Sequence, residues 1–173
     1  IDLSGTTDTN TISASGSVEL ANVVDTGTTT ATSPVELVVT AGTGVTLGTV
    51  TLSNTLDVDF DTATGTSTLN AGSLSAGTIE VDGVGTNDVM NFGSTVVSTV
   101  AGVTIGNAGT VDLDGDVTGA TTVTISDVGT EIDLAAGVDI TASGGNVDLN
   151  NTVAQIDLSG TTDTNTISAS GSV

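Results

Sequence analysis

Residues 103–134 read VTIGNAGTVDLDGDVTGATTVTISDVGTEIDL, and this stretch decides the fold. Its recurring unit is a triplet in which two apolar residues flank a polar one, such as VDL at 111–113 and IDL at 132–134. The triplet is typical of a short β-strand, because alternate side chains of a strand point to opposite faces of a sheet. Between the triplets lie Gly, Asn, Asp, Ser and Thr, which favour turns. The stretch therefore predicts short strands joined by tight corners.

Similar triplets recur along the whole chain, and their central residues fall into three series that advance by about 22 residues. The first series is Thr46, Thr68, Met90, Asp112, Asp133 and Asp157. The second series is Glu36, Val58, Glu80, Thr104, Thr124 and Asp148. The third and weaker series is Thr51, Leu74, Val97, Thr118 and Asp139.

Three short strands in every coil of about 22 residues are the signature of a parallel β-helix. We therefore predict an all-β parallel β-helix solenoid that runs as one continuous unit over residues 1–173 and coils to the right. Val, Leu and Ile would stack in its interior, with neighbouring coils about 4.8 Å apart. The regular alternation argues against a disordered low-complexity chain.

The chain also contains an exact duplication. Residues 1–18 read IDLSGTTDTNTISASGSV, and residues 156–173 repeat this sequence without a change, which gives a period of 155 residues (156 − 1). This period is about seven coils of the predicted length, so both copies should occupy the same position in the coil. We predict that residues 1–155 are one tandem repeat and that residues 156–173 begin the next identical repeat.

Two segments are expected to interrupt the regular coil. The segment 25–34 contains the only proline, Pro34, and proline cannot donate to a central ladder of hydrogen bonds. We therefore predict a protruding loop or a corner there. The Gly-rich segment 82–88 (DGVGTND) predicts a second corner.

The composition excludes several function classes. The chain has no Lys, Arg, His or Cys and a net charge of −21, so nucleic-acid binding and nucleophilic catalysis of the usual kinds lack their residues. Only 1% of the residues are aromatic, which leaves little surface on which sugars could stack. We predict that the chain is not an enzyme, with a carboxylate-dependent enzyme such as a polysaccharide lyase as a remote alternative.

The apolar runs are too short to span a membrane, so we predict no membrane insertion. No signal peptide is visible and the chain does not begin with Met. We interpret it as part of a longer secreted protein and expect an extracellular or cell-surface location.

Hard-cation binding is compatible with the composition, and calcium is the one cofactor that the sequence suggests. The first candidate run is 57–61 (DVDFD), which alternation would turn outward at its carboxylates. The second run, 112–116 (DLDGD), resembles the start of a calcium loop without its distal Glu. Ordinary solvent-facing positions are the alternative, which the sequence favours. The candidate ligands are Asp57, Asp59, Asp61, Asp112, Asp114 and Asp116.

The first series places Asp112, Asp133 and Asp157 on the same strand of consecutive coils. Two full charges at about 4.8 Å repel by roughly 0.9 kcal/mol even in water, and the chain has no basic side chain to neutralise them. We predict raised carboxyl pKa values or bound cations on this face.

Outward threonines would form a regular ice-binding array if T-x-T motifs recurred in every coil. The motifs at 49–51 and 122–124 do not recur at a fixed interval, so the sequence favours threonine as an ordinary strand residue.

Taken together, VxL triplets, Gly, Asn and Thr corners and about 20 residues per coil resemble the filamentous-haemagglutinin-type adhesins and the stalks of other large secreted β-helical proteins. The resemblance covers the whole chain and implies an extracellular stalk or filament, but no catalytic or receptor-binding residue. We expect a structural repeat of an extracellular filament, sheath or adhesin stalk, whose partner is a further copy of itself. The alternative is a cation-dependent adhesin or a carbohydrate-binding surface for glycans, with specificity in loop 25–34.

Overall fold

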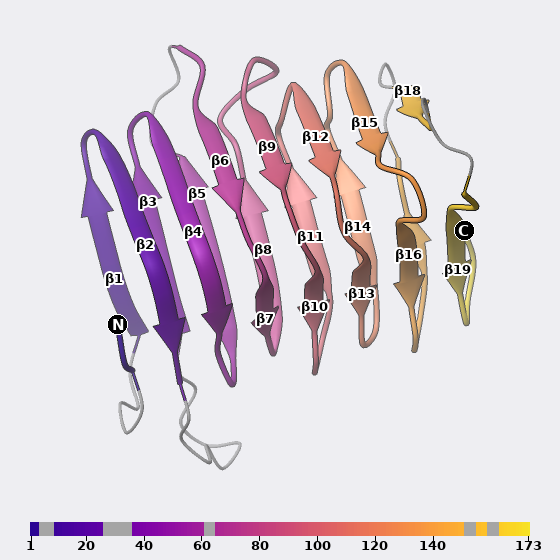
Figure 1. Ribbon diagram of the computed structural model, residues 1–173, viewed down its shortest axis with the longest axis horizontal. Helices are drawn as coiled ribbons and strands as arrows, with labels where there is room; N and C mark the ends of the chain where they lie inside the picture. Colours follow the sequence, from indigo (N-terminus) through magenta and orange to yellow (C-terminus); the bar gives the residue numbers. More distant parts are fainter. Residues whose placement is uncertain (4–8, 26–35, 61–64, 151–154, 159–162) are drawn as a thin grey trace.

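The protein is a parallel β-solenoid (Figure 1). The computed structural model describes residues 1–3, 9–25, 36–60, 65–150, 155–158 and 163–173. These residues form 19 strands and no helix, and the strands stack parallel in about six turns. The predicted fold class is therefore confirmed. The coils follow one another along the long axis, from the N-terminal end to the C-terminal end.

One side of the solenoid is a seven-stranded sheet, which we call the rear ladder because it lies behind the other sheet in Figure 1. Every neighbouring pair in it is parallel. Its strands are β1 (Thr9–Ala14), β3 (Glu36–Ala41), β5 (Thr55–Phe60), β8 (Thr78–Asp82), β11 (Val103–Gly106), β14 (Val123–Ser126) and β17 (Val147–Asp148).

The other side is a twelve-stranded sheet that contains two rows. The upper ladder consists of β6 (Thr68–Ala71), β9 (Val89–Phe92), β12 (Thr110–Leu113), β15 (Glu131–Leu134) and β18 (Gln155–Asp157). The lower ladder consists of β7 (Leu74–Ala76), β10 (Val96–Ser98), β13 (Val117–Gly119), β16 (Asp139–Ala142) and β19 (Thr166–Ala169).

Two long strands of eight residues, β2 (Ser17–Val24) and β4 (Gly44–Thr51), span both rows at the N-terminal end. Their first halves belong to the upper ladder and their second halves to the lower ladder, because β4 pairs with both β6 and β7. The predicted three strands per coil are therefore present from β6 onward, whereas the earlier coils have two.

The interior consists of apolar side chains stacked coil over coil. Leu69, Met90, Val111 and Ile132 pair in register along the upper ladder, and all four are fully buried. Each such side chain stabilises the fold by about 1.5–3 kcal/mol relative to an exposed one. Because a slip of one residue would turn such a column outward, the alternating pattern holds every strand in its register.

The corners depend on residues that accept unusual backbone angles. Asn107 and Asp127 have positive φ angles of 54° and 55° and directly follow the paired residues Gly106 and Ser126. Asn and Asp tolerate this left-handed conformation better than most residues. The corners after β11 and β14 therefore stack on each other, which keeps the next strands aligned.

The registers correct part of the predicted series. In the upper ladder, Thr46 pairs with Asn70 and Asn70 with Asn91, so Thr68 and Met90 were assigned wrongly. From Asp112 onward the first series is confirmed. The outward column of this ladder is Glu19, Thr46, Asn70, Asn91, Asp112, Asp133 and Asp157.

The other two series are corrected in the same way. In the rear ladder the column is Val38, Asp57, Glu80, Thr104, Thr124 and Asp148, so Glu36 and Val58 do not belong to it. In the lower ladder it is Thr51, Ser75, Val97, Thr118, Thr141 and Ser168, so Leu74 and Asp139 do not belong.

The coil is slightly longer than the sequence pattern predicted. Successive strands of one ladder lie roughly 23 residues apart in the chain. Single coils differ in length, since Asn70 and its neighbour Asn91 are 21 residues apart, whereas Thr141 and its neighbour Ser168 are 27 residues apart. At the average coil length, the period of the duplication is about six and two-thirds coils rather than the expected seven.

The two copies of the duplicated segment therefore occupy different positions. The TISA residues at 11–14 belong to β1 of the rear ladder, whereas the same residues at 166–169 form β19 of the lower ladder. The expectation that both copies share one register is wrong, because the repeat length is not a whole number of coils.

Candidate functional site

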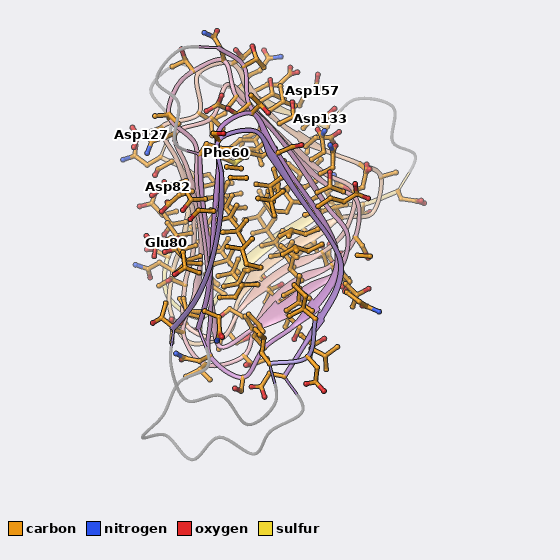
Figure 2. The ribbon with its side chains drawn as sticks, turned by 90° about the vertical axis from the view of Figure 1, so that its left-hand side faces the viewer. Phe60, Glu80, Asp82, Asp127, Asp133 and Asp157 are labelled. Atoms are coloured by element: carbon orange, nitrogen blue, oxygen red, sulfur yellow. The ribbon has the colours of Figure 1, made fainter. Side chains whose placement is uncertain are left out.

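Among the described residues, the polar side chains lie mainly in the outward columns of the ladders. On the upper ladder Asp112 pairs with Asp133, and Asp133 pairs with Asp157, as the sequence predicted. Three carboxylates thus occupy equivalent positions in consecutive coils. Figure 2 places Asp133 and Asp157 on the same side of the solenoid.

This arrangement raises the pKa of Asp112 above its ordinary value. Partial burial is the largest cause, followed by the negative charges of Asp114, Asp133 and Glu131. Each of these effects disfavours the charged form of the carboxyl group. The predicted rise in pKa is therefore confirmed for Asp112.

In the two preceding coils, amides replace the carboxylates. The Nδ2 of Asn91 donates a hydrogen bond to the Oδ1 of Asn70, with the two atoms 3.0 Å apart. An amide carries both a donor and an acceptor, so neighbouring coils can attract each other at this position. The same column is thus bonded between Asn70 and Asn91 and repulsive from Asp112 onward.

A second group of carboxylates lies on the rear ladder. Asp57 pairs with Glu80, and Asp59 pairs with Asp82. Burial, and after it the charge of Asp82, raises the pKa of Asp59. Figure 2 shows Glu80 and Asp82 on the opposite side of the cross-section from Asp133 and Asp157. The solenoid therefore carries acidic columns on two separate faces.

The rear group includes the first predicted cation run. Asp57 and Asp59 lie on β5 between the buried residues Leu56, Val58 and Phe60, so the predicted alternation is confirmed there. Asp61 lies outside the described residues.

The second run begins on β12 and continues into the turn after it. Asp112 is half-buried, whereas Asp114 and Asp116 are exposed. The Oδ1 of Asp116 accepts a hydrogen bond of 2.9 Å from the backbone N–H of Asp139 in the next coil. Asp139 in turn accepts one of 2.8 Å from the N–H of Thr166. These two carboxylates thus connect successive coils of the lower ladder.

Within the described part of the chain, no three carboxylates form a group that could hold a metal ion. The structure brings Asp57 and Asp59 onto one strand and Asp112, Asp114 and Asp116 onto one strand end, and the two runs lie on different ladders. Calcium binding stays a prediction.

The lower ladder presents a row of hydroxyl groups that a fixed spacing in the sequence does not reveal. Most of the outward positions on and just before its strands are Ser or Thr. The Oγ of Ser73 lies 3.2 Å from the Oγ1 of Thr95, and the Oγ1 of Thr141 lies 3.1 Å from the Oγ of Ser168. The T-x-T motif at 49–51 thus continues as hydroxyl pairs in later coils, at intervals that vary with corner length. Register, rather than a fixed period, was the signal needed to find it.

The corner predicted at 82–88 is confirmed, and a buried carboxylate holds it. Asp88 is 2% exposed. Its Oδ1 accepts a hydrogen bond of 2.8 Å from the N–H of Ser67, and its Oδ2 accepts bonds of 2.8 and 3.3 Å from the N–H groups of Val84 and Gly85. Three donors compensate for the burial of the charge. Asp88 is therefore a structural residue.

Another structural carboxylate is Asp25, at the start of the segment predicted to protrude. The backbone N–H and the hydroxyl of Ser53 both donate to its Oδ2. Residues 26–35, including Pro34, lie outside the described residues, and with them most of the predicted recognition loop.

The C-terminal end of the stack exposes apolar side chains. Ile156, Leu158 and Val173 are 42%, 50% and 74% exposed, although Ile156 pairs in register with the fully buried Ile132. Ile156 and Val173 line a hollow there together with Leu149 and Ile167, and most of its lining is apolar. We call this the end surface, and none of the described residues forms a further coil over its interior columns.

None of the described residues forms a helix with the length and hydrophobicity that a membrane crossing requires. Comparison of the chain with known proteins gives no match among protein-family models, curated proteins or solved structures.

Proposed function

We propose that this chain is a structural repeat of an extracellular filament, sheath or adhesin stalk of the filamentous-haemagglutinin-like type. The observation that carries the proposal is the combination of parallel ladders along the described coils with the apolar end surface. Ile156, Leu158 and Val173 lie there beside β17, β18 and β19, which end their ladders among the described residues. A further coil of the same kind would bury these side chains and pair the edge.

The duplication supplies the partner for this surface. Since the sequence of residues 1–18 recurs at 156–173, the coil that fits over the end surface belongs to another copy of the same repeat. In such an array each repeat covers the end of the one before it, as in other solenoids whose units contact only their neighbours. The net charge of −21 keeps neighbouring fibres apart and hydrated.

Electron microscopy and fibre diffraction of the native material test the proposal. We expect smooth fibres with a strong axial spacing of about 4.8 Å from stacked coils. A rise of about 32 Å per repeat follows from about 6.7 coils at that spacing. Discrete monomeric particles in the native material, without fibres, would contradict the proposal.

A second candidate is a cation-dependent adhesin or a carbohydrate-binding surface. The row of hydroxyl groups on the lower ladder, beside the carboxylates of Asp116 and Asp139, favours it, because sugar hydroxyls need both donors and acceptors. Glycan arrays with calcium and with EDTA separate the two candidates. Calcium-dependent binding that is lost in T118V/T141V would support recognition by this face, whereas absence of binding in both conditions supports a purely structural role.

A further inference from the structure

The two copies of the duplicated segment lie on different ladders. In each copy three parts pair with neighbouring coils, and each part is displaced by one ladder between the copies. In the N-terminal copy, Asp2 bridges Val24 at the lower ladder, Thr9–Ala14 joins the rear ladder, and Ser17 pairs with Gly44 on the upper ladder. The three parts of the segment thus pair with the lower, rear and upper ladders, in that order along the chain.

In the C-terminal copy, each part lies on the ladder that comes one position earlier along the coil. Asp157 pairs with Asp133 on the upper ladder, and Thr166–Ala169 joins the lower ladder beside β16. The carbonyl of Ser172 then accepts a hydrogen bond of 3.0 Å from the N–H of Val147, at the start of the last rear strand. All three parts are displaced coherently, as expected for a period of about six and two-thirds coils.

Both positions accept the segment because their inward columns are alike. In the rear ladder Ile12 pairs with Val39 and Ala14 with Ala41. In the lower ladder the equivalent Ile167 pairs with Ile140, and Ala169 with Ala142. A β-branched residue and the alanine two positions later therefore meet the same kind of neighbour in both ladders.

We infer that successive repeats in a filament of this sequence are offset by one face of the coil, so that each sequence position moves to a different ladder in the next repeat. The inference rests on the proposed function for its filament, but the offset itself is a property of this chain. Three repeats, about 20 coils, bring a given residue back to its original ladder.

The offset distributes the acidic columns around the fibre. The column of Asp112 and Asp133 belongs to the upper ladder in this repeat and would belong to another ladder in the next one. A repeat of a whole number of coils would instead place this acidic stretch on the upper ladder again in every repeat. Over three repeats every face of the offset fibre receives the same set of side chains, which makes its surface equivalent on all sides.

Engineered cysteine pairs test the offset in the full chain, because the sequence contains no cysteine. Ser168 pairs with Thr141 in the structure, and in a filament without the offset it would lie over Asn150 on the rear ladder. Neighbouring coils at about 4.8 Å are within the Cα range of a disulfide, about 4.4–6.8 Å. We expect S168C/T141C to form the disulfide under mild oxidation and S168C/N150C to keep free thiols, as measured by alkylation and mass spectrometry.

The variant S13C/T40C is the matched control. Ser13 occupies the same place in the duplicated sequence as Ser168 and pairs with Thr40 on the rear ladder, so its disulfide should form equally well. Circular dichroism of each reduced variant checks that the fold is retained. A disulfide in S168C/N150C, whether or not S168C/T141C also forms one, or a disulfide in neither variant, would overturn a fixed offset.

The cysteine test of the offset and the fibre test of the proposed filament can fail independently. If fibres are absent from native material but S168C/T141C forms its disulfide, the filament is rejected and the offset of the two copies stands. If fibres are present but S168C/N150C forms the disulfide, the filament stands and the offset is rejected.

Discussion

At the scale of single residues, the neighbours of a carboxylate decide whether it strengthens or weakens the solenoid. Asp88 is almost fully buried and accepts three backbone hydrogen bonds, so its charge is used to hold a corner. Asp112 is half-buried among Asp114, Glu131 and Asp133, so its charge opposes folding. The same residue type therefore has opposite effects at two positions in one molecule.

Substitution of Asp88 tests the first effect. Asp88→Ala leaves three backbone donors without their acceptor. The bond from Ser67 is buried, and a buried unpaired group costs about 1–3 kcal/mol, whereas the donors of Val84 and Gly85 are only partly buried. We expect the free energy of unfolding to fall by about 1–3 kcal/mol in urea titration, mainly from the buried donor of Ser67. The control is Asp82→Ala at the other end of the same corner, where the carboxylate accepts a 3.3 Å bond from Asn107 and repels Asp59. Equal losses in both variants would contradict this role for Asp88.

The raised pKa of Asp112 predicts a pH dependence with a definite direction. The folded chain binds this proton more readily than the unfolded chain, whose carboxyl pKa is near 3.8. Stability therefore falls as pH rises through the window between 3.8 and the raised pKa, and the full penalty remains at neutral pH.

Asp112→Asn removes this penalty. Relief of about 0.5–1 kcal/mol of repulsion should raise the Tm at pH 7 by roughly 1–4 °C, and the increase should disappear near pH 3. The matched control is Asn91→Asp, which adds a carboxylate beside Asp112 and removes the donor to Asn70, so its Tm should fall. A Tm gain for Asp112→Asn that is independent of pH would contradict the electrostatic explanation.

At the scale of strands, the coil requires glycine where neighbouring backbones approach most closely. A side chain at Gly48, in the middle of β4, would overlap the backbone carbonyl of Ala21 in the preceding coil. At Gly16, before β2, an added Cβ meets nothing within 4 Å. Gly48 lies between the two halves of β4 that pair with the upper and lower ladders, and there β4 comes very close to the backbone of β2.

These two glycines form a matched test. Gly48→Ala should lower the free energy of unfolding by about 1–3 kcal/mol, because the neighbouring backbone must shift. Gly16→Ala should leave stability unchanged or raise it by up to about 1 kcal/mol by restricting the unfolded chain. Thermal and urea unfolding of both variants gives the comparison. A Gly48→Ala variant as stable as Gly16→Ala would show that the carbonyl of Ala21 can move freely.

Strand registers also show how much of the fold could be predicted from the sequence. The alternation of apolar and polar residues identified the parallel solenoid and the stack of Asp112, Asp133 and Asp157. It placed Met90 outward, although Met90 is fully buried, because counting at a fixed interval ignored coils that differ in length at their corners. A slip of one residue is enough to reverse a side chain.

The variation in coil length also concealed the row of hydroxyl groups on the lower ladder. The hydroxyl pairs at Ser73 and Thr95, and at Thr141 and Ser168, are separated by 22 and 27 residues, so no single period reveals them. Corner length depends on local turn geometry and on side chains such as Asp88, which bond across coils. These long-range contacts cannot be predicted from the spacing of apolar residues alone.

At the scale of the whole molecule, the charge is of one sign. Without Lys, Arg or His, interactions between charged side chains are repulsive everywhere, and their sum opposes the compact state. Screening by salt extends over about 10 Å at 0.1 M and about 3 Å at 1 M, so repulsion between neighbouring coils weakens progressively over this range.

We therefore expect the Tm to rise steadily with NaCl, by several degrees between low salt and about 1 M. Calcium at equal ionic strength separates general screening from specific binding. A larger increase with calcium that EDTA reverses would support the predicted cation sites, and loss of that increase in D57N/D59N or D112N/D114N would locate them. A Tm that does not change across the salt series would contradict the account of the charge.

The parallel ladders have a mechanical consequence. Their hydrogen bonds run along the long axis, so tension on the two ends loads them directly, coil after coil. Opening one coil releases roughly 23 residues, and at about 3.4 Å per extended residue this lengthens the chain by roughly 70 Å. In a single-molecule pulling experiment we expect a sawtooth of such steps rather than one large rupture. A filament of these coils would then dissipate tension in small steps, because single coils open while the remaining coils stay folded.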